Sequence, residues 1–123
     1  MEIEFEYLEF DEEVFPENQK LTIFRIIQEQ LNNIIKHAGA SHVQICLKEN
    51  NNQVSLTIKD DGKGFDPKKV RKGLGFINIA NRAELFGGKK QVITAPGKGC
   101  LLKVIFPHPK LNTADTTLPI SLT

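Results

Sequence analysis

Residues 54–66 read VSLTIKDDGKGFD, a strand-like segment that runs into two acids and a glycine-rich turn. Alternation along the first half predicts a strand with Val54, Leu56 and Ile58 on one face. Counting on by two places Asp60 on this same buried face. A buried carboxylate without a partner costs several kcal/mol, so a donor from the protein or from a ligand must compensate it. The adjacent glycines favour a ligand, because glycine allows close approach to the backbone.

The elements around this stretch are predicted in the order β-α-β-β-α-β-β. Alternation predicts strands near 2–7 (with one solvated face), 43–48, 53–60, 90–94 and 100–106, and helical spacing predicts helices from Pro16 to Ala38 and over 76–86. Helices alternate with hairpins, which favours a two-layer α/β sandwich: one mixed, mostly antiparallel sheet with the helices packed on one face. Residues 1–107 are expected to form this domain, and residues 108–123, rich in Pro and Thr, a flexible tail.

The first helix is predicted to bury one apolar stripe and to present polar groups on its other side. The stripe recurs at helical spacing and comprises Leu21, Phe24, Ile27, Leu31, Ile34, Ile35 and Ala38. Glu29, Asn33 and Lys36 lie opposite it, three and four residues apart, with His37 at the margin. An ordinary solvated face explains this arrangement. So does a site in which carboxylate and amide oxygens face a cation while the two basic side chains face phosphate.

Length and composition bound the class of protein. A chain of 123 residues suits one domain, and no apolar run approaches the roughly 20 residues of a membrane span. No secretory signal is visible at the N-terminus. Cys46 and Cys100 lack zinc-like spacing, so we expect reduced thiols in a cytoplasmic protein.

Charge is distributed unevenly, although the formal net charge is only +1. Residues 1–17 carry eight acids and no base, whereas residues 18–123 carry 16 bases and seven acids. The basic cluster within 63–72 suits either a solvated loop or a loop that covers a polyanion. Nucleic acid is not expected as a partner, because this basic run is short.

An ordered set of motifs between residues 28 and 88 resembles the ATP-binding domain of sensor histidine kinases. DNA gyrase, the heat-shock-ninety chaperones and MutL-type repair proteins share this superfamily. QEQLNNIIKHA at 28–38 is similar to the N box of the family, and DDGKGF at 60–65 to its G1 box. GLGF at 73–76, continuing to the glycine pair at 87–88, resembles the G2 region. The form of the N box and the short loop resemble the subfamily that partners helix-turn-helix response regulators.

The resemblance implies the α/β sandwich known as the Bergerat fold, with ATP and Mg²⁺ as ligands. The implied reaction is transfer of the γ-phosphoryl group of ATP to a histidine, which depends on positioning and charge neutralisation. Asp60 would accept a hydrogen bond from the adenine amino group, and Asn33 would ligate Mg²⁺. Glu29 would be the catalytic residue, as a base or water-positioning group beside the reacting phosphate.

The same resemblance implies a wider nucleotide-binding set, made up of Asn33, Lys36, His37, Asp60, Gly62, Gly64, Gly73, Leu74, Gly75 and Cys100. Within it, the two basic residues would lie near the phosphates, and residues 66–75 would form a lid over the nucleotide. Cys100 is a departure, because the family usually has threonine at this place, after Gly97-Lys98-Gly99. A thiol is the weaker hydrogen-bonding group, which puts a water-mediated adenine contact there in question.

A complete kinase of this family also needs a dimerisation segment that carries the acceptor histidine. The chain begins too late to hold one, and His37, His42 and His108 are poor acceptors by their positions. The resemblance therefore implies an isolated catalytic domain that binds ATP and does not phosphorylate itself. Its expected partners are the dimerisation domain of a parent kinase and a downstream response regulator, and direct contact with a membrane is not expected.

Two other functions are consistent with the sequence to a lesser degree. The first is an anti-sigma factor or serine kinase of the same superfamily, which the N-box form and the lid length disfavour. The second is a degenerate scaffold that binds no nucleotide. The presence of Glu29, Asn33, Asp60 and the glycines argues against the scaffold.

Overall fold

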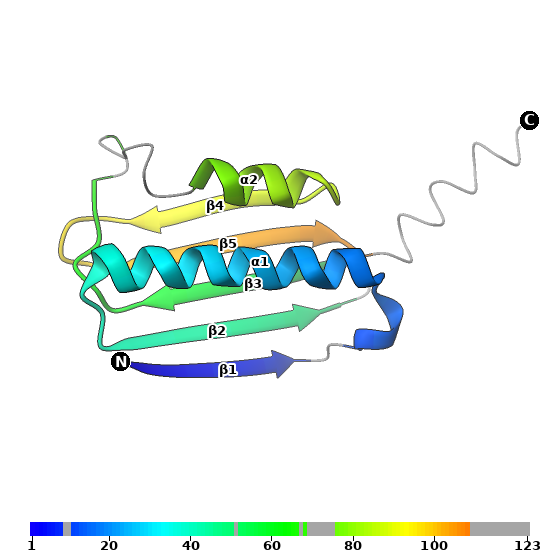
Figure 1. Ribbon diagram of the computed structural model, residues 1–123, viewed down its shortest axis with the longest axis horizontal. Coiled ribbons are helices and arrows are strands. Elements are labelled where there is room, and N and C mark those ends of the chain that lie inside the picture. The colour runs from blue at the N-terminus through cyan, green and yellow to red at the C-terminus, as the bar shows by residue number, and fades with distance from the viewer. Residues whose placement is uncertain (9–10, 51, 67, 69–75, 109–123) are drawn as a thin grey trace, which may run out of the picture.

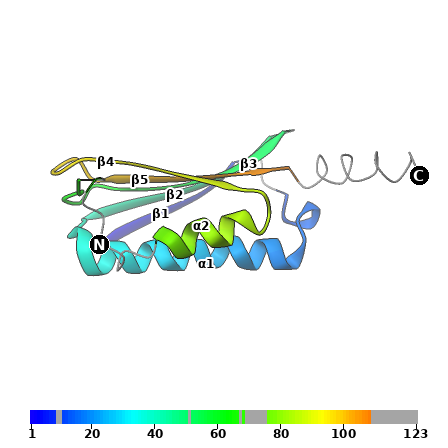
Figure 2. The same ribbon diagram turned by 90° about the horizontal axis from the view of Figure 1, so that it is seen from above.

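A computed structural model describes residues 1–8, 11–50, 52–66, 68 and 76–108, and it has two layers (Figures 1 and 2). The sheet contains β1 (Glu2–Leu8), β2 (His42–Glu49), β3 (Gln53–Asp60), β4 (Lys89–Thr94) and β5 (Cys100–Pro107). The helices are α1 (Glu17–Asn33) and α2 (Phe76–Glu84), with short turns η1 (Glu12–Val14) and η2 (Ile34–Ala38). Both long helices cover the same face of the sheet, which confirms the predicted α/β sandwich.

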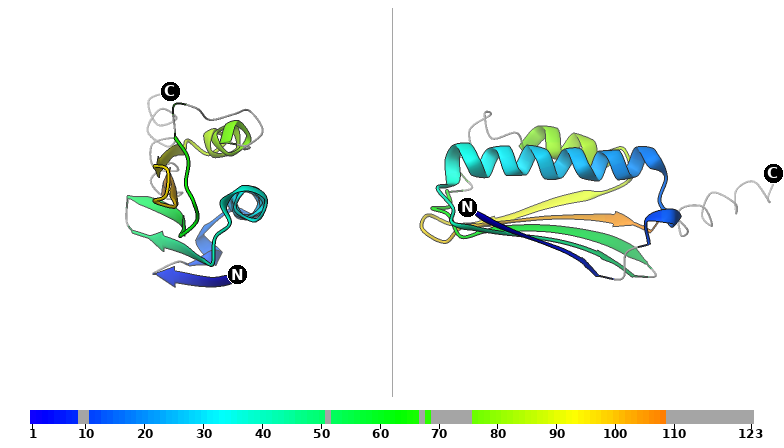
Figure 3. Two further views of the ribbon diagram at one scale, coloured as in Figure 1. Left: turned by 90° about the vertical axis from the view of Figure 1, so that its left-hand side faces the viewer. Right: turned by 60° about the horizontal axis from the view of Figure 1, so that its bottom comes forward.

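The sheet order is β1-β2-β3-β5-β4, with β1 parallel to β2 and every other pair antiparallel. The helix α1 forms the crossover that a parallel pair requires. Asp60, at the end of β3, lies opposite Val43 at the start of β2 and Cys100 at the start of β5. The ends of the motif-bearing elements therefore meet at one end of the sheet, where α1 also ends (Figure 3).

Alternate residues of the strands point toward the helices and form the sheet's part of the hydrophobic core. Inward residues of β2, β3 and β5 are buried, namely Val43, Ile45, Leu47, Val54, Leu56, Ile58, Leu102, Val104 and Phe106. Asp60 and Cys100 continue the buried faces of their strands, at 3% and 6% exposure. The prediction that both residues lie on the buried face of the sheet is confirmed. No helix of the described residues combines the length and the hydrophobicity that a membrane crossing needs.

The predicted stripe of α1 is partly wrong. Leu21, Phe24 and Ile35 are 50%, 55% and 65% exposed, whereas the buried face consists of Gln19, Thr22, Ile23, Ile26, Ile27, Gln30 and Ile34. Gln19, Thr22 and Gln30 belong to the buried face, so the centre of this face differs from the side of the helix with the most apolar residues. Apolarity alone therefore misplaced the face by part of a turn.

The end of the N-box helix is also different from the prediction. Regular α-helix stops at Asn33, and residues Ile34–Ala38 form a π-helical turn. Gly39 then ends the helix in the left-handed conformation, with φ of 62°, as the sequence predicts. π-helical turns are rare and occur frequently at functional sites.

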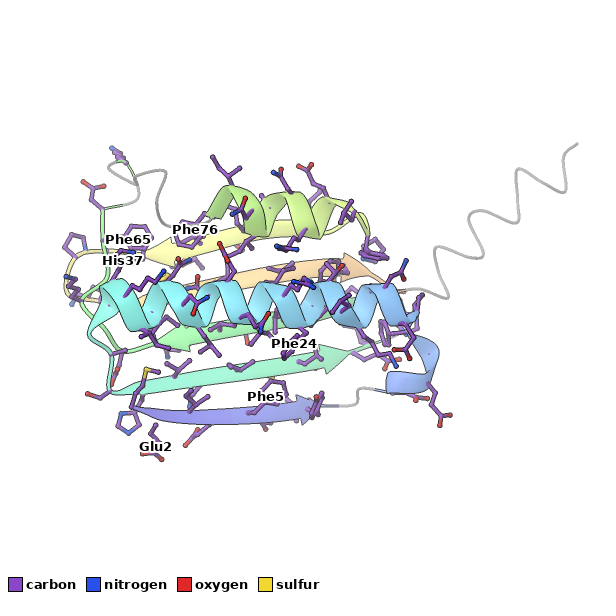
Figure 4. All side chains as sticks on the ribbon, in the orientation of Figure 1. Glu2, Phe5, Phe24, His37, Phe65 and Phe76 are labelled. Atoms are coloured by element: carbon purple, nitrogen blue, oxygen red, sulfur yellow. The ribbon has the colours of Figure 1, made fainter. Side chains whose placement is uncertain are left out.

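The strand β1 is one of the two edge strands of the sheet, and α1 leaves it uncovered. All its residues are exposed, so the predicted burial of one face is wrong. Ile3, Phe5 and Tyr7 instead line an apolar groove of about 420 Å³, together with Phe24 and Leu31 of α1. Phe5 and Phe24 are labelled in Figure 4.

Candidate functional site

A pocket of about 210 Å³ lies where the ends of α1 and β3 and the start of β5 meet the start of α2. It brings together six of the predicted nucleotide-binding residues, namely Asn33, Lys36, His37, Asp60, Gly64 and Cys100. The sequence reasoning missed six further lining residues, which are Gln30, Ile34, Ala38, Lys63, Phe65 and Phe76. In Figure 4 the labelled His37, Phe65 and Phe76 side chains lie at this end of the molecule. Gly73, Leu74 and Gly75 are outside the described residues.

Asp60 is the buried acid of this pocket. Its Oδ1 accepts a hydrogen bond from the Gly62 amide at 2.8 Å. The pKa of the Asp60 carboxyl is raised, chiefly by burial and also by the charge of Asp61. Hydrogen bonds from the Gly62 and Cys100 amides lower it, but by less. Of the two sources of a donor that the sequence leaves open, the protein thus supplies one, although the adjacent glycines favoured a ligand. Because the pKa remains raised, these donors compensate burial incompletely.

The carboxylate of Asp61, the next residue, contacts the backbone at the start of β2 instead of the pocket. Its Oδ1 accepts hydrogen bonds from the backbone amides of Ser41 at 2.8 Å and His42 at 2.9 Å. These amides, His42 first, lower the pKa of the Asp61 carboxyl. The acid therefore fixes the start of β2 to the end of β3. Two adjacent acids are thus shifted in opposite directions, and Asp60 is the one that faces the pocket.

The two glycines of the turn are required by the protein itself. A side chain at Gly62 would lie 2.5 Å from the Ala38 carbonyl oxygen, next to the bond of 2.9 Å that this oxygen accepts from the Lys63 amide. Gly64 has φ of 62°, and a side chain there would overlap the Ala95 carbonyl. Close packing of the G1 turn against neighbouring backbone explains both residues. Contact of these glycines with a nucleotide stays a prediction.

Thr94 connects the turn to β5, a role that no feature of the sequence predicts. The Thr94 hydroxyl donates to the Gly99 carbonyl at 2.6 Å and accepts from the Phe65 amide at 3.2 Å. Thr94 also lies opposite Cys100 in the β4–β5 pair. One hydroxyl thus holds three segments together behind the pocket.

On α1, Asn33 lines the pocket beside a fully buried amide. The Asn33 Nδ2 donates to Gln30 Oε1 at 3.2 Å, and Gln30 is 1% exposed. Glu29 is not among the lining residues, and its Oε1 accepts a hydrogen bond of 3.4 Å from Asn78 Nδ2 of α2. The structure therefore places Asn33, the predicted metal ligand, at the pocket, and Glu29, the predicted base, outside its lining in contact with α2.

Aromatic rings occupy the side of the pocket near α2. The rings of Phe65 and Phe76 have centroids 5.6 Å apart. The Lys90 ammonium lies 5.4 Å from the Phe76 centroid, within the range of a cation–π contact. Phe65 belongs to the glycine-rich turn and Phe76 is the first residue of α2, so this pair connects the two glycine motifs.

Cys100 lies on the opposite side, next to Asp60. Burial raises the pKa of the Cys100 thiol to about 11, the negative charge of Asp60 adds to this, and hydrogen bonds with the Thr94 and Gln30 side chains oppose it. At neutral pH the group is therefore a neutral thiol.

The sequence matches the family described as histidine kinase-, DNA gyrase B- and HSP90-like ATPase over residues 18–110. The chain belongs to this family. The match covers the N box, the G1 box and every residue that lines the pocket. Six of the predicted nucleotide-binding residues lie around one cavity, whereas Gly62 and Glu29 do not line it.

Named relatives of this ATPase domain are histidine kinases. The signal transduction histidine-protein kinase/phosphatase DegS of Brevibacillus brevis is 35% identical over 96 residues, which is 77% of this chain and 25% of DegS. The chain thus spans about a quarter of that relative. The ATP-binding domain of PrrB from Mycobacterium tuberculosis is 28% identical with a TM-score of 0.62, over 72% of this chain and 68% of that domain.

The fold of the ATPase domain recurs in a more distant kinase. The histidine kinase domain of the blue-light activated histidine kinase from Erythrobacter litoralis superposes with a TM-score of 0.70 at 20% identity. The likeness covers 90% of this chain and 54% of that domain. It shows that this kinase contains the same two-layer sandwich.

The thiols of this ATPase domain should differ in reactivity. With a pKa near 11, Cys100 is protonated at pH 8 and is also buried, so we expect it to resist a disulfide reagent in the folded domain. Cys46 is partly exposed and should react. Titration of free thiols at pH 8 should give one fast equivalent and a second only in denaturant. Fast reaction of the Cys46→Ser variant would contradict this result.

Proposed function

We propose that this chain is the catalytic domain of a two-component histidine kinase, which binds Mg-ATP and supplies its γ-phosphoryl group to a histidine on a dimerisation domain. Asp60 carries the proposal. It is a carboxylate with 3% exposure at the pocket wall, and its raised pKa means that its own donors leave it incompletely compensated. The exocyclic amino group of adenine is a further N–H donor that this acceptor can take.

The remaining lining residues suit the other parts of ATP. Lys36, His37 and Lys63 are basic groups at the same pocket, and such groups pair with phosphate oxygens. The Phe65 and Phe76 rings offer flat apolar surface for the nucleoside. For Gly73, Leu74 and Gly75, the family supports a role as the lid segment that contacts phosphate at the start of a helix.

The residues present also fit Mg²⁺. This ion takes few protein ligands, prefers oxygen, and keeps water and phosphate oxygens around it. Among the described residues no group of three or more acidic, histidine or cysteine side chains is arranged for a metal, so a single amide oxygen fits a shared site better than a protein cage. Asn33 would supply that oxygen. When bound, the ion would neutralise phosphate charge.

Glu29 is proposed to act beside the reacting phosphate, as a base or as the group that orients the attacking nucleophile. Its contact with Asn78 orients the carboxylate from the side of α2. This hydrogen bond also ties the acid to the helix that follows the predicted lid. Movement of that helix would therefore change the orientation of Glu29.

The phosphoryl group is proposed to leave for a histidine outside residues 1–108. Of the three histidines, His108 is 4% exposed with its Nε2 2.7 Å from Glu49 Oε2, and His42 lies 3.3 Å from carboxylates of both Glu2 and Asp61. His37 lines the pocket, where it is proposed to contact phosphate. The dimerisation domain of a parent kinase and its response regulator are therefore the proposed partners. The use of ATP and the free thiols support a cytoplasmic location for the domain.

Calorimetry with ATP and ITP in Mg²⁺ tests this function. ITP replaces the adenine amino group with a carbonyl, which would oppose the Asp60 acceptor with another acceptor. ATP should bind about 30-fold tighter than ITP or better, because the unpaired buried acceptor is costly. Labelled ATP should not mark the domain itself on histidine. Equal binding of the two nucleotides, or stoichiometric self-labelling, would contradict the proposal.

The Asn33→Ala variant should separate metal-dependent from metal-free binding. Because Asn33 is proposed to hold the cation and not the base, Mg²⁺ should raise the ATP affinity of the variant about tenfold less than that of the wild type. Affinity in EDTA should change little. Asn32→Ala is the matched control, since Asn32 is the exposed neighbour on the same helix. Equal losses with and without Mg²⁺ would argue against a ligand role for Asn33.

A further inference from the structure

Gln30 is a polar residue in a position that the core would otherwise fill with an apolar one. It is 1% exposed, and it is the one polar member among the largest fully buried side chains of the described residues. It also lines the same pocket as Asn33 and Cys100. A buried amide has two donor hydrogens and an acceptor oxygen, each of which needs a partner. The partners of Gln30 therefore decide how its side chain is oriented.

The oxygen of Gln30 is committed to Asn33. Gln30 Oε1 accepts the hydrogen bond from Asn33 Nδ2 at 3.2 Å. The two polar atoms of a planar amide lie on opposite sides of its carbon, so this bond leaves Asn33 Oδ1 on the side away from Gln30. If the Asn33 amide turned over, its NH₂ group would take that place and would repel a cation. The Gln30 acceptor thus selects one of two amide orientations.

Gln30 is also close to Cys100. Both residues line the same pocket, and interaction with the Gln30 side chain opposes the rise in the pKa of the Cys100 thiol. Cys100 in turn lies opposite Asp60 in the β3–β5 pair. No polar atom of Gln30 is left buried without a partner in the part of the chain that the structure describes.

We propose that Gln30 is a positioning residue for the cation-binding amide of Asn33. Its oxygen holds the Asn33 nitrogen, so that the Asn33 oxygen is presented to the pocket. The inference rests on the proposed function, in which Asn33 ligates Mg²⁺. Gln30 contacts no cation itself and acts through Asn33.

The Gln30→Met variant tests this role, because methionine removes both amide groups at nearly the same volume. Gln19→Met is the matched control. Gln19 is also buried in α1, at 3% exposure, and lies eleven residues earlier, about 16 Å away along the helix axis. ATP affinity is measured in Mg²⁺ and in EDTA. Gln30→Met should reduce the gain in affinity from Mg²⁺ by about tenfold, and Gln19→Met should leave it unchanged.

A second measurement needs no nucleotide. The side-chain NH₂ signals of Asn33 in the ¹⁵N–¹H spectrum of the free domain should shift in Gln30→Met and stay in place in Gln19→Met. In a double-mutant cycle, Gln30→Met with Asn33→Ala should have the same Mg²⁺ response as Asn33→Ala alone, because one residue acts through the other. Gln30→Leu serves as the apolar variant if Gln30→Met does not fold.

The outcomes separate this inference from the proposed function. If the wild type binds Mg-ATP and Gln30→Met keeps its full Mg²⁺ response, or the two mutations add independently, the positioning role is overturned and the proposed function stands. A wild-type domain that binds no nucleotide overturns both. A lost Mg²⁺ response together with shifted Asn33 signals supports the role.

Discussion

Replacing Asp60 by Asn should reduce ATP affinity about 100-fold or more, because an acceptor aimed at the adenine amino group gains a competing donor. The fold should survive, since an amide oxygen can still accept the 2.8 Å bond from Gly62. The same change should erase the preference for ATP over ITP, whose carbonyl suits the new NH₂ group. Calorimetry with both nucleotides measures the effect.

The stability of this variant follows from the pKa of Asp60. A carboxyl whose folded pKa is raised above 3.8 binds its proton more tightly in the folded state. Its contribution to stability is therefore full below pH 4 and is lost as the pH rises through the raised pKa. Above the raised pKa the ionised carboxyl has lost this contribution, whereas Asn is uncharged at every pH, so in that range Asp60→Asn should unfold no more easily than the wild type.

Asp61→Asn is the control for these measurements. The carboxyl of Asp61 accepts the amides of Ser41 and His42 and faces away from the proposed adenine contact. ATP affinity of this variant should stay within about threefold of the wild type, because the Asn oxygen can still accept the two amides and the side chain does not line the pocket. A loss as large as that of Asp60→Asn would mean that both variants act through the local fold, and the adenine contact would be wrong.

The Gly64→Ala substitution should reduce the free energy of unfolding more than Gly97→Ala or Asp60→Asn. The φ of 62° costs alanine roughly 1–2 kcal/mol, and overlap with the Ala95 carbonyl adds about 1–3 kcal/mol. The added carbon would also lie 2.8 Å from the Gly99 carbonyl. We expect a total of about 3 kcal/mol in the free energy of unfolding, measured by urea denaturation.

Gly97→Ala isolates the backbone part of this loss. Gly97 has φ of 77°, and a methyl group added there would have no atom within 4 Å, so only the left-handed conformation opposes alanine. The expected loss is about 1 kcal/mol. Equal losses at Gly64 and Gly97 would refute the explanation by close packing.

The strands and the acid at the end of β3 were predictable from the sequence because the period of a strand is two. With this period a side chain lies on one of two faces. The apolar residues of β3 and β5 show which face is buried, and Asp60 and Cys100 lie on that face. The helix offered less certainty. Its buried face includes Thr22 and Gln30, while Phe24 is exposed in the groove beside β1. Buried polar residues such as these are not marked by a hydrophobicity pattern.

The site was predictable where a motif fixes a residue, and hidden where contacts are long-range. Asn33 and Asp60 follow from local motifs. The contact between Thr94 and Phe65 joins residues 29 positions apart, and no local signal marks such a hydroxyl as a partner of the glycine turn. His108, expected in the tail, is buried against Glu49, 59 positions earlier, because β5 brings it there.

The meeting of α1, β3 and β5 at one end of the sheet has a consequence for the life of the protein in a cell. Asn33, Asp60 and Cys100 come together only when the helix and both strands are in place, so a partly unfolded chain has no binding site. Any nucleotide that binds there selects the complete fold. At a free concentration about 100 times its dissociation constant, such a ligand would add about 2.7 kcal/mol to the unfolding free energy. The cellular nucleotide pool would then protect the domain against proteolysis.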